Sequence, residues 1–161
     1  MSLRWRQGRA RSPGTAEGKL TGIKENPMAL ITKMLGTHPA GPRAADPRLL
    51  AECLEACAEC ASVCNACADA CLGEDMLGDL VACIRTDLDC AEICAATAAV
   101  LSRTATTGPA TAALLHACVA ACAACAEECQ QHASMHEHCR ICADACRRCL
   151  NACEKLLASL G

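Results

Sequence analysis

The sequence has almost no aromatic side chains. Phe and Tyr are absent, and Trp5 is the only aromatic residue among 161. Much of the apolar fraction is Ala together with 18 cysteines, so the chain cannot build a core of large, closely packed side chains. Something other than Leu and Phe has to fill the interior of its fold.

The chain also lacks an apolar run that reads as an export signal or a membrane span. Its first residues, MSLRWRQGRARSPGTAEGKLTGIKENP, are basic without the apolar stretch of a signal peptide. No segment reads as long and apolar enough to cross a bilayer. We therefore expect a cytoplasmic protein with no membrane partner, in which thiols stay reduced and clustered cysteines indicate metal. The basic leader is typical of a disordered tail, so no nucleic-acid partner is expected.

Sequence motifs of catalysis are missing as well. We find no Ser/His/Asp set, no Gly-rich phosphate loop and no pair of acid/base carboxylates. The pairs CAEC and CRIC lack the βαβ context of a thioredoxin-like redox site. The sequence therefore favours storage or buffering over catalysis, and we expect no enzyme.

The chain divides into a leader and one helical domain. Residues 1–45 read as a largely disordered leader with one short helix near 28–35, and residues 46–161 read as a metal-binding domain. Asp46 and Pro47 provide an N-cap and a first-turn proline for the first helix of this domain.

Four helices are predicted within that domain. The first ends near Gly73, the second runs over about 75–103, and the third over about 109–131. A capping box of Ser134 with Glu137 would begin the fourth, which ends near residue 160. Short connections imply antiparallel neighbours, so the predicted fold class is all-α, an antiparallel up-and-down four-helix bundle with a Cys-lined core.

Every cysteine falls on one stripe of one of these helices. Residues spaced alternately three and four apart share the side of a helix that a bundle turns inward, and CLEACAECASVCNACADAC is such a seam. In chain order the four stripes are Cys53, Cys57, Cys60, Cys64, Cys67 and Cys71; Cys83, Cys90 and Cys94; Cys118, Cys122, Cys125 and Cys129; and Cys139, Cys142, Cys146, Cys149 and Cys153.

Metal binding explains the thiol stripes better than packing or disulfides. Cys fills far less volume than Leu, so 18 of them would leave voids between the helices. A disulfide needs a Cβ separation of about 3.8 Å, whereas neighbours along one helix are about 5–6 Å apart. Links between helices remain possible, and they leave a thiol redox sensor as one alternative.

Soft thiolates select Cu(I), zinc or iron–sulfur clusters. Zinc wants four convergent ligands, and we expect straight helices to offer two neighbouring thiols more readily than four, which favours two- or three-coordinate Cu(I). Iron–sulfur clusters need loop-rich settings. Sharing each thiolate between two ions keeps the core near neutral, so we predict multiple Cu(I) ions per chain, closer to about 18 than to about 9.

The two ends of the predicted bundle differ. At one end the stripes continue into Met76, His132 and Met135, with His136 and His138 close by. We expect Cu(I) to enter there, with His132 the strongest candidate, so that Cys71 meets copper early and Cys53 late. The opposite end forms a plug of four leucines, namely Leu50, Leu101, Leu115 and Leu156.

Two features of the second predicted helix stand apart from its thiols. Asp87 is in inward register between Cys83 and Cys90, where it could serve as an accessory copper ligand or accept a thiol hydrogen bond. We instead expect the helix to rotate there so that Asp87 reaches solvent. A separate apolar line would suit a face buried against another subunit: Leu77, Val81, Ile84, Leu88 and Ala91.

The repeated CxxxC/CxxC ladder over residues 47–160 resembles the bacterial copper storage proteins, which are Cys-lined four-helix bundles. The sequence shows no twin-arginine export signal, and in this it resembles the cytosolic branch of the family. The resemblance implies a homotetramer that stores copper along the core and admits it at a His/Met mouth. Sequestration of Zn(II) or Cd(II), as in metallothionein, remains an alternative, because it would use the same thiols. A metallochaperone would instead hold one or two ions at an exposed site.

Overall fold

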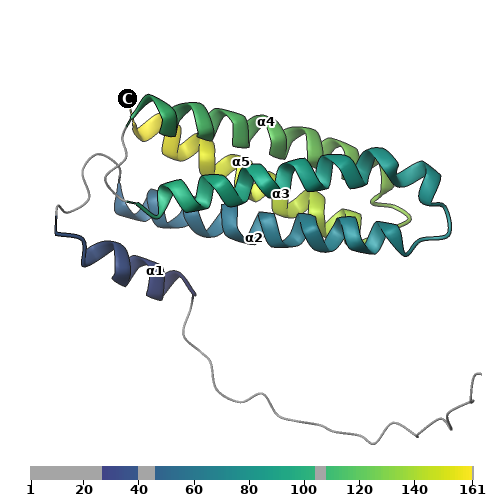
Figure 1. The fold of residues 1–161 in the computed structure, drawn as a ribbon, viewed down its shortest axis with the longest axis horizontal. Coiled ribbons are helices and arrows are strands. Elements are labelled where there is room, and N and C mark those ends of the chain that lie inside the picture. Colours follow the sequence, from purple (N-terminus) through teal and green to yellow (C-terminus); the bar gives the residue numbers. More distant parts are fainter. Residues whose placement is uncertain (1–26, 40–45, 104–107, 161) are drawn as a thin grey trace, which may run out of the picture.

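The computed structural model describes residues 27–39, 46–103 and 108–160, and every regular element in these ranges is helical (Figure 1). Most of the predicted leader, residues 1–26 and 40–45, lies outside the described residues. The elements, in chain order, are α1 (Pro27–Gly36), α2 (Pro47–Leu72), the 3-10 turn η1 (Leu77–Leu80), α3 (Val81–Leu101), α4 (Pro109–His132) and α5 (Glu137–Ser159).

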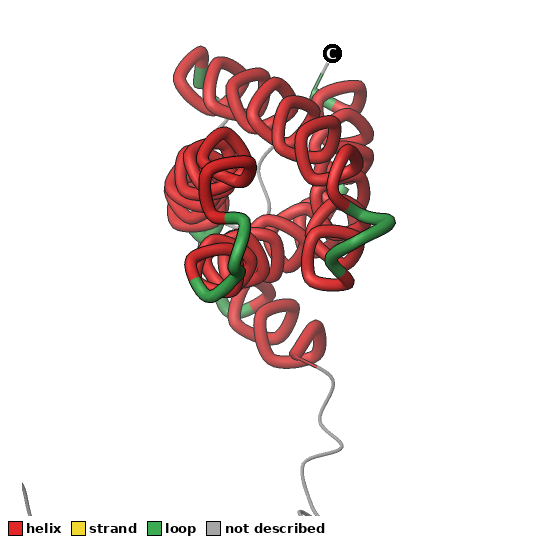
Figure 2. Tube along the Cα trace, turned by 90° about the vertical axis from the view of Figure 1, so that its right-hand side faces the viewer, coloured by secondary structure: helices red, strands yellow, loops and turns green. Residues whose placement is uncertain are grey.

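Helices α2 to α5 form the predicted antiparallel bundle. α2 packs against α3 and α5, and α4 packs against the same two helices, so the four surround one axis (Figure 2). The α2–α3 and α4–α5 connections lie at the same end, which we call the mouth (Figure 1). The short helix α1 packs on the outside of α2. The all-α class and the four-helix arrangement predicted from the sequence are confirmed.

The start of α2 follows the local sequence signals. The side chain of Asp46 accepts a hydrogen bond from the backbone N–H of Arg48 at 2.8 Å, and Pro47 occupies the first turn, where it needs no N–H partner. At the other end the N–H of Gly73 bonds to the carbonyl of Ala70 at 3.0 Å. Both boundaries of α2 agree with the prediction.

The predicted capping box at the start of α5 is wrong. The carbonyl of His132 accepts hydrogen bonds from the N–H groups of Met135 and His136, at 3.0 and 2.9 Å, so residues 133–135 form a turn that finishes α4. Ser134 belongs to that turn and does not cap α5. His136 takes the N-cap position with an extended backbone and no side-chain capping bond.

The second long helix is shorter than predicted. Residues 77–80 form the 3-10 turn η1, and regular α-helix begins only at Val81. Gly78 lies within this turn, and glycine disfavours α-helix by about 1 kcal/mol relative to Ala. The mouth is therefore built from a loop, a 3-10 turn and the first residues of α5.

The expectation that no segment is long and apolar enough to cross a membrane is wrong for α4. Among the described residues, this one helix passes that test by length and composition alone. Its four cysteines all point into the bundle, where each is fully buried. Ala fills much of the rest of the helix before Glu127, which is why this stretch of α4 is apolar.

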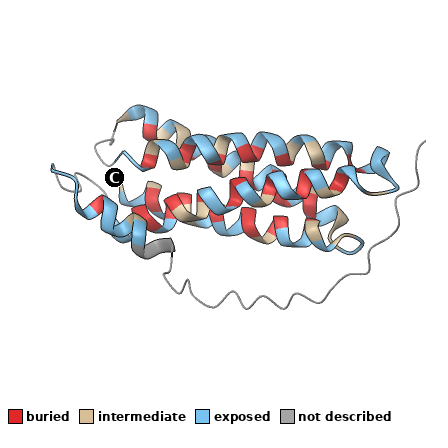
Figure 3. Ribbon diagram, turned by 60° about the horizontal axis from the view of Figure 1, so that its bottom comes forward, coloured by how far each residue is buried: buried red, intermediate tan, exposed pale blue. Residues whose placement is uncertain are grey.

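Thiols and leucines divide the core between them. All 18 cysteines are buried, and none is more than 2% exposed. Figure 3 shows buried segments alternating with exposed ones along each long helix. Leu50, Leu101, Leu115 and Leu156 are also buried, as the predicted plug requires. They lie at the end opposite the mouth, together with the buried Thr97 and Thr111.

The predicted outer apolar line, which begins in η1 and continues on α3, is only partly exposed. Leu77, Val81 and Leu88 are 40%, 43% and 45% exposed, as a surface for another subunit requires. Ala91 is wrong as a member of this line, because it is 1% exposed and packs within the core. It lies on the α3 flank that faces a neighbouring helix rather than on the outer face.

Candidate metal centre

Most thiols meet partners on other helices rather than on their own. Sulfur atoms lie 3.5 to 4.0 Å apart throughout the core, for example Cys94 and Cys122 at 3.5 Å and Cys53 and Cys153 at 3.6 Å. Among the described residues, two thiol contacts within 4.0 Å join neighbours along one helix: Cys60 with Cys64, and Cys90 with Cys94, both at 3.8 Å. The candidate metal sites are therefore formed between helices.

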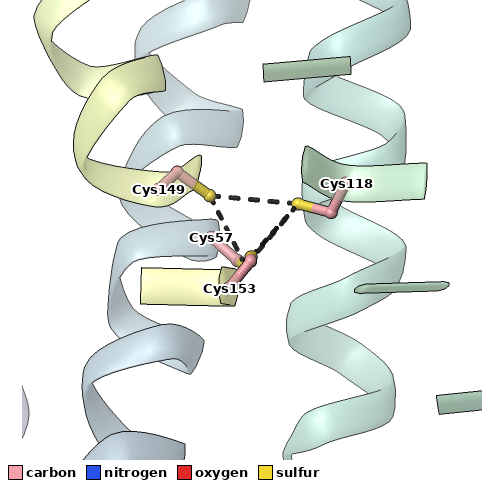
Figure 4. Close-up of side chains that lie close together, drawn as sticks. All are labelled: Cys57, Cys118, Cys149 and Cys153. Carbon is pink, nitrogen blue, oxygen red and sulfur yellow. Dashed lines mark hydrogen bonds between the residues drawn. The ribbon is translucent and has the colours of Figure 1, made fainter. Parts of the chain in front are cut away.

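The thiols gather in groups of four. Within each group the sulfur atoms all lie within 4.8 Å of one another, and one group joins α2, α4 and α5 (Figure 4). Five such groups are Cys57, Cys118, Cys149 and Cys153; Cys60, Cys94, Cys122 and Cys149; Cys60, Cys64, Cys90 and Cys146; Cys64, Cys125, Cys142 and Cys146; and Cys67, Cys71, Cys83 and Cys139.

These groups overlap. Cys149 belongs to the first and second groups, Cys60 to the second and third, and Cys64 and Cys146 to the third and fourth. The first four groups therefore form one continuous series. The fifth, Cys67 with Cys71, Cys83 and Cys139, shares no thiol with them and lies at the mouth. We call this fifth group the mouth quartet.

The prediction that four convergent thiols would be scarce is wrong. It considered each helix separately, whereas the antiparallel register brings thiols from three or four helices to one level. At about 2.3 Å from each sulfur, a three-coordinate ion separates the sulfurs by about 4.0 Å and a four-coordinate ion by about 3.8 Å. The observed spacing suits both, so coordination geometry alone does not select copper over zinc.

No thiol is bonded to another. All 18 cysteines are free, and the nearest sulfurs are 3.5 Å apart, against about 2.05 Å in a disulfide. Burial raises the pKa of Cys139 to about 12 and also raises the pKa of Cys71. The mouth quartet thus contains protonated thiols near neutral pH, and a soft metal ion has to displace their protons.

Asp87 lies in the core, so the expectation that it reaches solvent is wrong. Its side chain is fully buried, and Oδ1 accepts S–H hydrogen bonds from Cys125 at 3.0 Å and from Cys129 and Cys142 at 3.3 Å each. The helix does not rotate, because the thiols around Asp87 satisfy its carboxyl group. Burial raises its pKa to about 7. Asp87 lies between the two sets of thiols: its Oδ2 is 3.9 Å from Cys83 of the mouth quartet, and its Oδ1 contacts Cys125 and Cys142 of the continuous series.

His138 is the histidine that contacts the thiols, which our candidate ligands did not include. Its Nδ1 lies 3.4 Å from Sγ of Cys139, 3.5 Å from Cys67 and 3.9 Å from Cys71. Its position directly before Cys139 at the start of α5 is the signal that could have identified it. The side chain is 23% exposed, so it links the mouth quartet to solvent.

The other predicted entry residues surround the mouth at different depths. His132 and His136 are partly buried, with side chains 12% and 16% exposed. Nε2 of His132 is buried and makes no hydrogen bond within the described residues, although Oε1 of Glu128 is 3.5 Å away. Met76 and Met135 are 64% and 71% exposed, because the loop and turn that hold them leave the helical stripes.

Comparison with known proteins agrees with this arrangement. The family model for copper storage proteins matches residues 47–158. No curated relative matches the chain. The matched range begins at the first residue of α2 and ends in the last turn of α5, so it covers the whole four-helix bundle.

Solved structures of similar proteins contain copper. A copper storage protein from Streptomyces lividans, Ccsp, loaded with 10 copper equivalents, is 55% identical, covering 81% of this chain and 99% of that chain with a TM-score of 0.77. A cytosolic copper storage protein from the same organism, with five coppers, is 59% identical over 71% and 96% of the two chains, with a TM-score of 0.68. Cu(I)-bound BsCsp3 is 37% identical over 65% and 94%, with a TM-score of 0.59.

Proposed function

The chain belongs to the copper storage protein family, and from this membership we propose that all 18 of its core cysteines bind the Cu(I) ions that it stores in the cytosol. The observation that carries the assignment of the ligands is the series of four-thiol groups that share members along the bundle. Shared thiolates suit a string of ions rather than isolated sites. The family is one of storage proteins, and we propose no catalytic activity.

Softness favours Cu(I) over a divalent ion in this core, and charge disfavours Zn(II) sites that share no thiolate. A Zn(II) ion with four private thiolates carries a net charge of −2, and burying several such sites would cost several kcal/mol each. One Cu(I) for each thiolate leaves the core neutral. Cu(I) is also the softer ion and suits an all-sulfur environment.

Anomalous scattering at the copper edge, measured on a crystal of the Cu(I)-loaded protein, tests the storage assignment. We expect a row of copper peaks along the bundle axis, each within bonding distance of two or three sulfurs. A parallel competition experiment adds Cu(I) to Zn(II)-loaded protein and should release all the zinc. Retained zinc with few copper peaks would favour zinc or cadmium sequestration instead.

We propose the mouth as the entrance for copper. His132, His136 and His138 provide imidazoles of graded exposure, and Met76 and Met135 provide solvent-exposed thioethers. Both ligand types bind Cu(I) more weakly than thiolate does, so they can pass an ion inward. The leucine plug at the opposite end offers no ligand atom.

Removal of the entry ligands should slow loading without lowering capacity. We expect the combined variant Met76→Leu, His132→Ala and Met135→Leu to load the first Cu(I) equivalents at least several-fold more slowly in stopped-flow experiments, and to reach the same final equivalents. His116→Ala is a matched control, since His116 is exposed on α4 far from the mouth. Equal loading rates for the variant and the wild type would contradict the entry role.

Asp87 is our proposed accessory residue. In the copper-free protein it accepts S–H bonds from four thiols, three at Oδ1 and that of Cys83 at Oδ2, and once Cu(I) replaces those protons its oxygens can bind the adjacent ions.

We also propose a homo-oligomer, a tetramer as the family resemblance implies, that buries Leu77, Val81 and Leu88. Sedimentation of the variant with Val81→Glu and Leu88→Glu should yield smaller species than the wild type if this face is used.

A further inference from the structure

One carboxylate oxygen holds two histidines at the mouth. Oε1 of Glu74, in the turn after α2, lies 3.2 Å from Nε2 of His138 and 3.1 Å from Nδ1 of His136. The backbone N–H of Glu74 bonds to the carbonyl of Cys71 at 3.3 Å, which fixes the turn to a member of the mouth quartet. The ring centroids of the two histidines are 5.3 Å apart.

These contacts determine where each imidazole carries its proton. An ionised carboxylate only accepts hydrogen bonds, so a nitrogen that faces it carries the hydrogen. The hydrogen bond from His138 lowers the pKa of Glu74, which keeps the carboxyl group ionised. His138 is then protonated at Nε2 and bare at Nδ1, the atom that lies 3.4 Å from Cys139. Nδ1 of His136 lies 3.1 Å from the same carboxylate oxygen, which favours the reverse arrangement, with the proton on Nδ1 and Nε2 bare.

We propose that Glu74 is a positioning residue that fixes opposite tautomers of His136 and His138, so that one offers a lone pair to the entrance and the other to the thiols. The inference rests on the proposed entry of copper at the mouth. Cu(I) binds Nε2 of His136, moves to Nδ1 of His138, and then exchanges onto a thiolate of the mouth quartet. At the last step the copper–nitrogen bond breaks, a copper–sulfur bond forms and the thiol proton leaves to solvent, with no change in oxidation state.

Three substitutions of Glu74 separate positioning from simple attraction of a cation. Glu74→Ala removes the contact. Glu74→Gln removes the charge but keeps an acceptor oxygen at the same reach, whereas Glu74→Asp keeps the charge and withdraws it by one methylene. Asp75→Ala is the control, since Asp75 is an exposed acid in the same turn. Each variant is measured as the full-length, reduced, copper-free protein.

The first measurement needs no copper. Long-range nitrogen–proton correlation spectra distinguish the two imidazole tautomers of a neutral histidine. In the wild type we expect His138 protonated at Nε2 and His136 at Nδ1. In Glu74→Ala, His136 should revert to the Nε2–H form that free imidazole side chains favour. A wild-type His136 protonated at Nε2 would overturn the inference.

The second measurement is stopped-flow loading of the first Cu(I) equivalents. Loss of a group that orients a metal-binding histidine costs about 10- to 100-fold, so Glu74→Ala and Glu74→Asp should load that much more slowly, with Glu74→Gln and Asp75→Ala close to wild type. Slow loading by the Glu74→Gln variant together with normal loading by the Glu74→Asp variant would mean that only the negative charge at residue 74 matters. If His138→Ala loads slowly but Glu74→Ala does not, the role of Glu74 is wrong. If both load normally, copper does not pass through His138 and the inference is wrong, whereas the entry proposal fails only if the combined Met76, His132 and Met135 variant also loads normally.

Discussion

Titration of the reduced, copper-free protein with Cu(I) is expected to saturate near 18 equivalents per chain, about one ion for each cysteine. The physical reason is charge. Each ion replaces one thiol proton, so the core is neutral both before and after loading. A capacity of about 9, with two private thiolates for each ion, would leave about nine net negative charges in a narrow interior.

The contacts between thiols make such sharing possible. Cys57, for example, has sulfur neighbours in Cys118 at 3.9 Å, Cys149 at 3.6 Å and Cys153 at 3.7 Å. A bridging thiolate needs metal ions on two sides, and a sulfur surrounded by three others can provide them without a large backbone movement. Proton release accompanies this exchange, because thiols such as Cys139 are protonated at neutral pH.

The titration is carried out under a competing Cu(I) chelator, and proton release is followed in weak buffer. We expect about one proton for each ion throughout the loading. Saturation near nine equivalents would refute thiolate sharing, and saturation at four or fewer would contradict storage altogether.

Substitution of one four-thiol group provides a local test of the same idea. Replacement of the four thiols in Figure 4, Cys57, Cys118, Cys149 and Cys153, by Ser should lower the capacity by about four ions. The initial loading rate should stay unchanged, because these residues lie toward the helix ends opposite the mouth. The same substitutions in the mouth quartet should cost the same capacity and also slow the loading. Equal loading rates for the two variants would contradict entry at one end.

Helical periodicity predicted which residues face inward. A spacing of three and four identifies one side of a helix whatever its partners are, so the stripe positions from Cys53 to Cys153 all proved to be buried. The leucine plug follows from the same extrapolation, since Leu101 and Leu156 lie on uninterrupted helix. Caps and prolines also identified the starts of α2 and α4 within one residue.

The periodicity of a sequence does not determine the register of neighbouring helices, that is, how far each is shifted along the bundle axis. The four-thiol groups depend on that register, which is why the sequence indicated pairs along one helix where the structure has groups across several. Extrapolated stripes also fail wherever the helix stops, so Met76 and Met135 proved to be exposed. His138 was not among the candidate ligands, because two of the three thiols that it contacts, Cys67 and Cys71, lie on α2, which is distant in sequence.

Asp87→Asn is expected to stabilise the copper-free protein at neutral and higher pH. The folded-state pKa of Asp87 is raised to about 7 by burial, whereas an Asp in an unfolded chain titrates near about 3.9. Between these values the folded state binds more protons than the unfolded state, so the contribution of Asp87 to stability is complete below about pH 4 and is lost as the pH rises through about 7.

The asparagine side chain is neutral at every pH, so the variant should lack this loss. Above pH 7 the free energy of unfolding of Asp87→Asn should exceed that of the wild type by a few kcal/mol, and the difference should fall to near zero or reverse below about pH 4. Denaturant unfolding of both reduced, metal-free proteins from pH 4 to pH 8 measures this difference in the free energy of unfolding.

The control is Asp89→Asn, because Asp89 is an exposed neighbour on α3, and this variant should follow the wild-type curve. Parallel curves for Asp87→Asn and the wild type would mean that the pKa of Asp87 is not raised in the core, and that the thiols of Cys125, Cys129 and Cys142 hold its carboxylate ionised across this pH range.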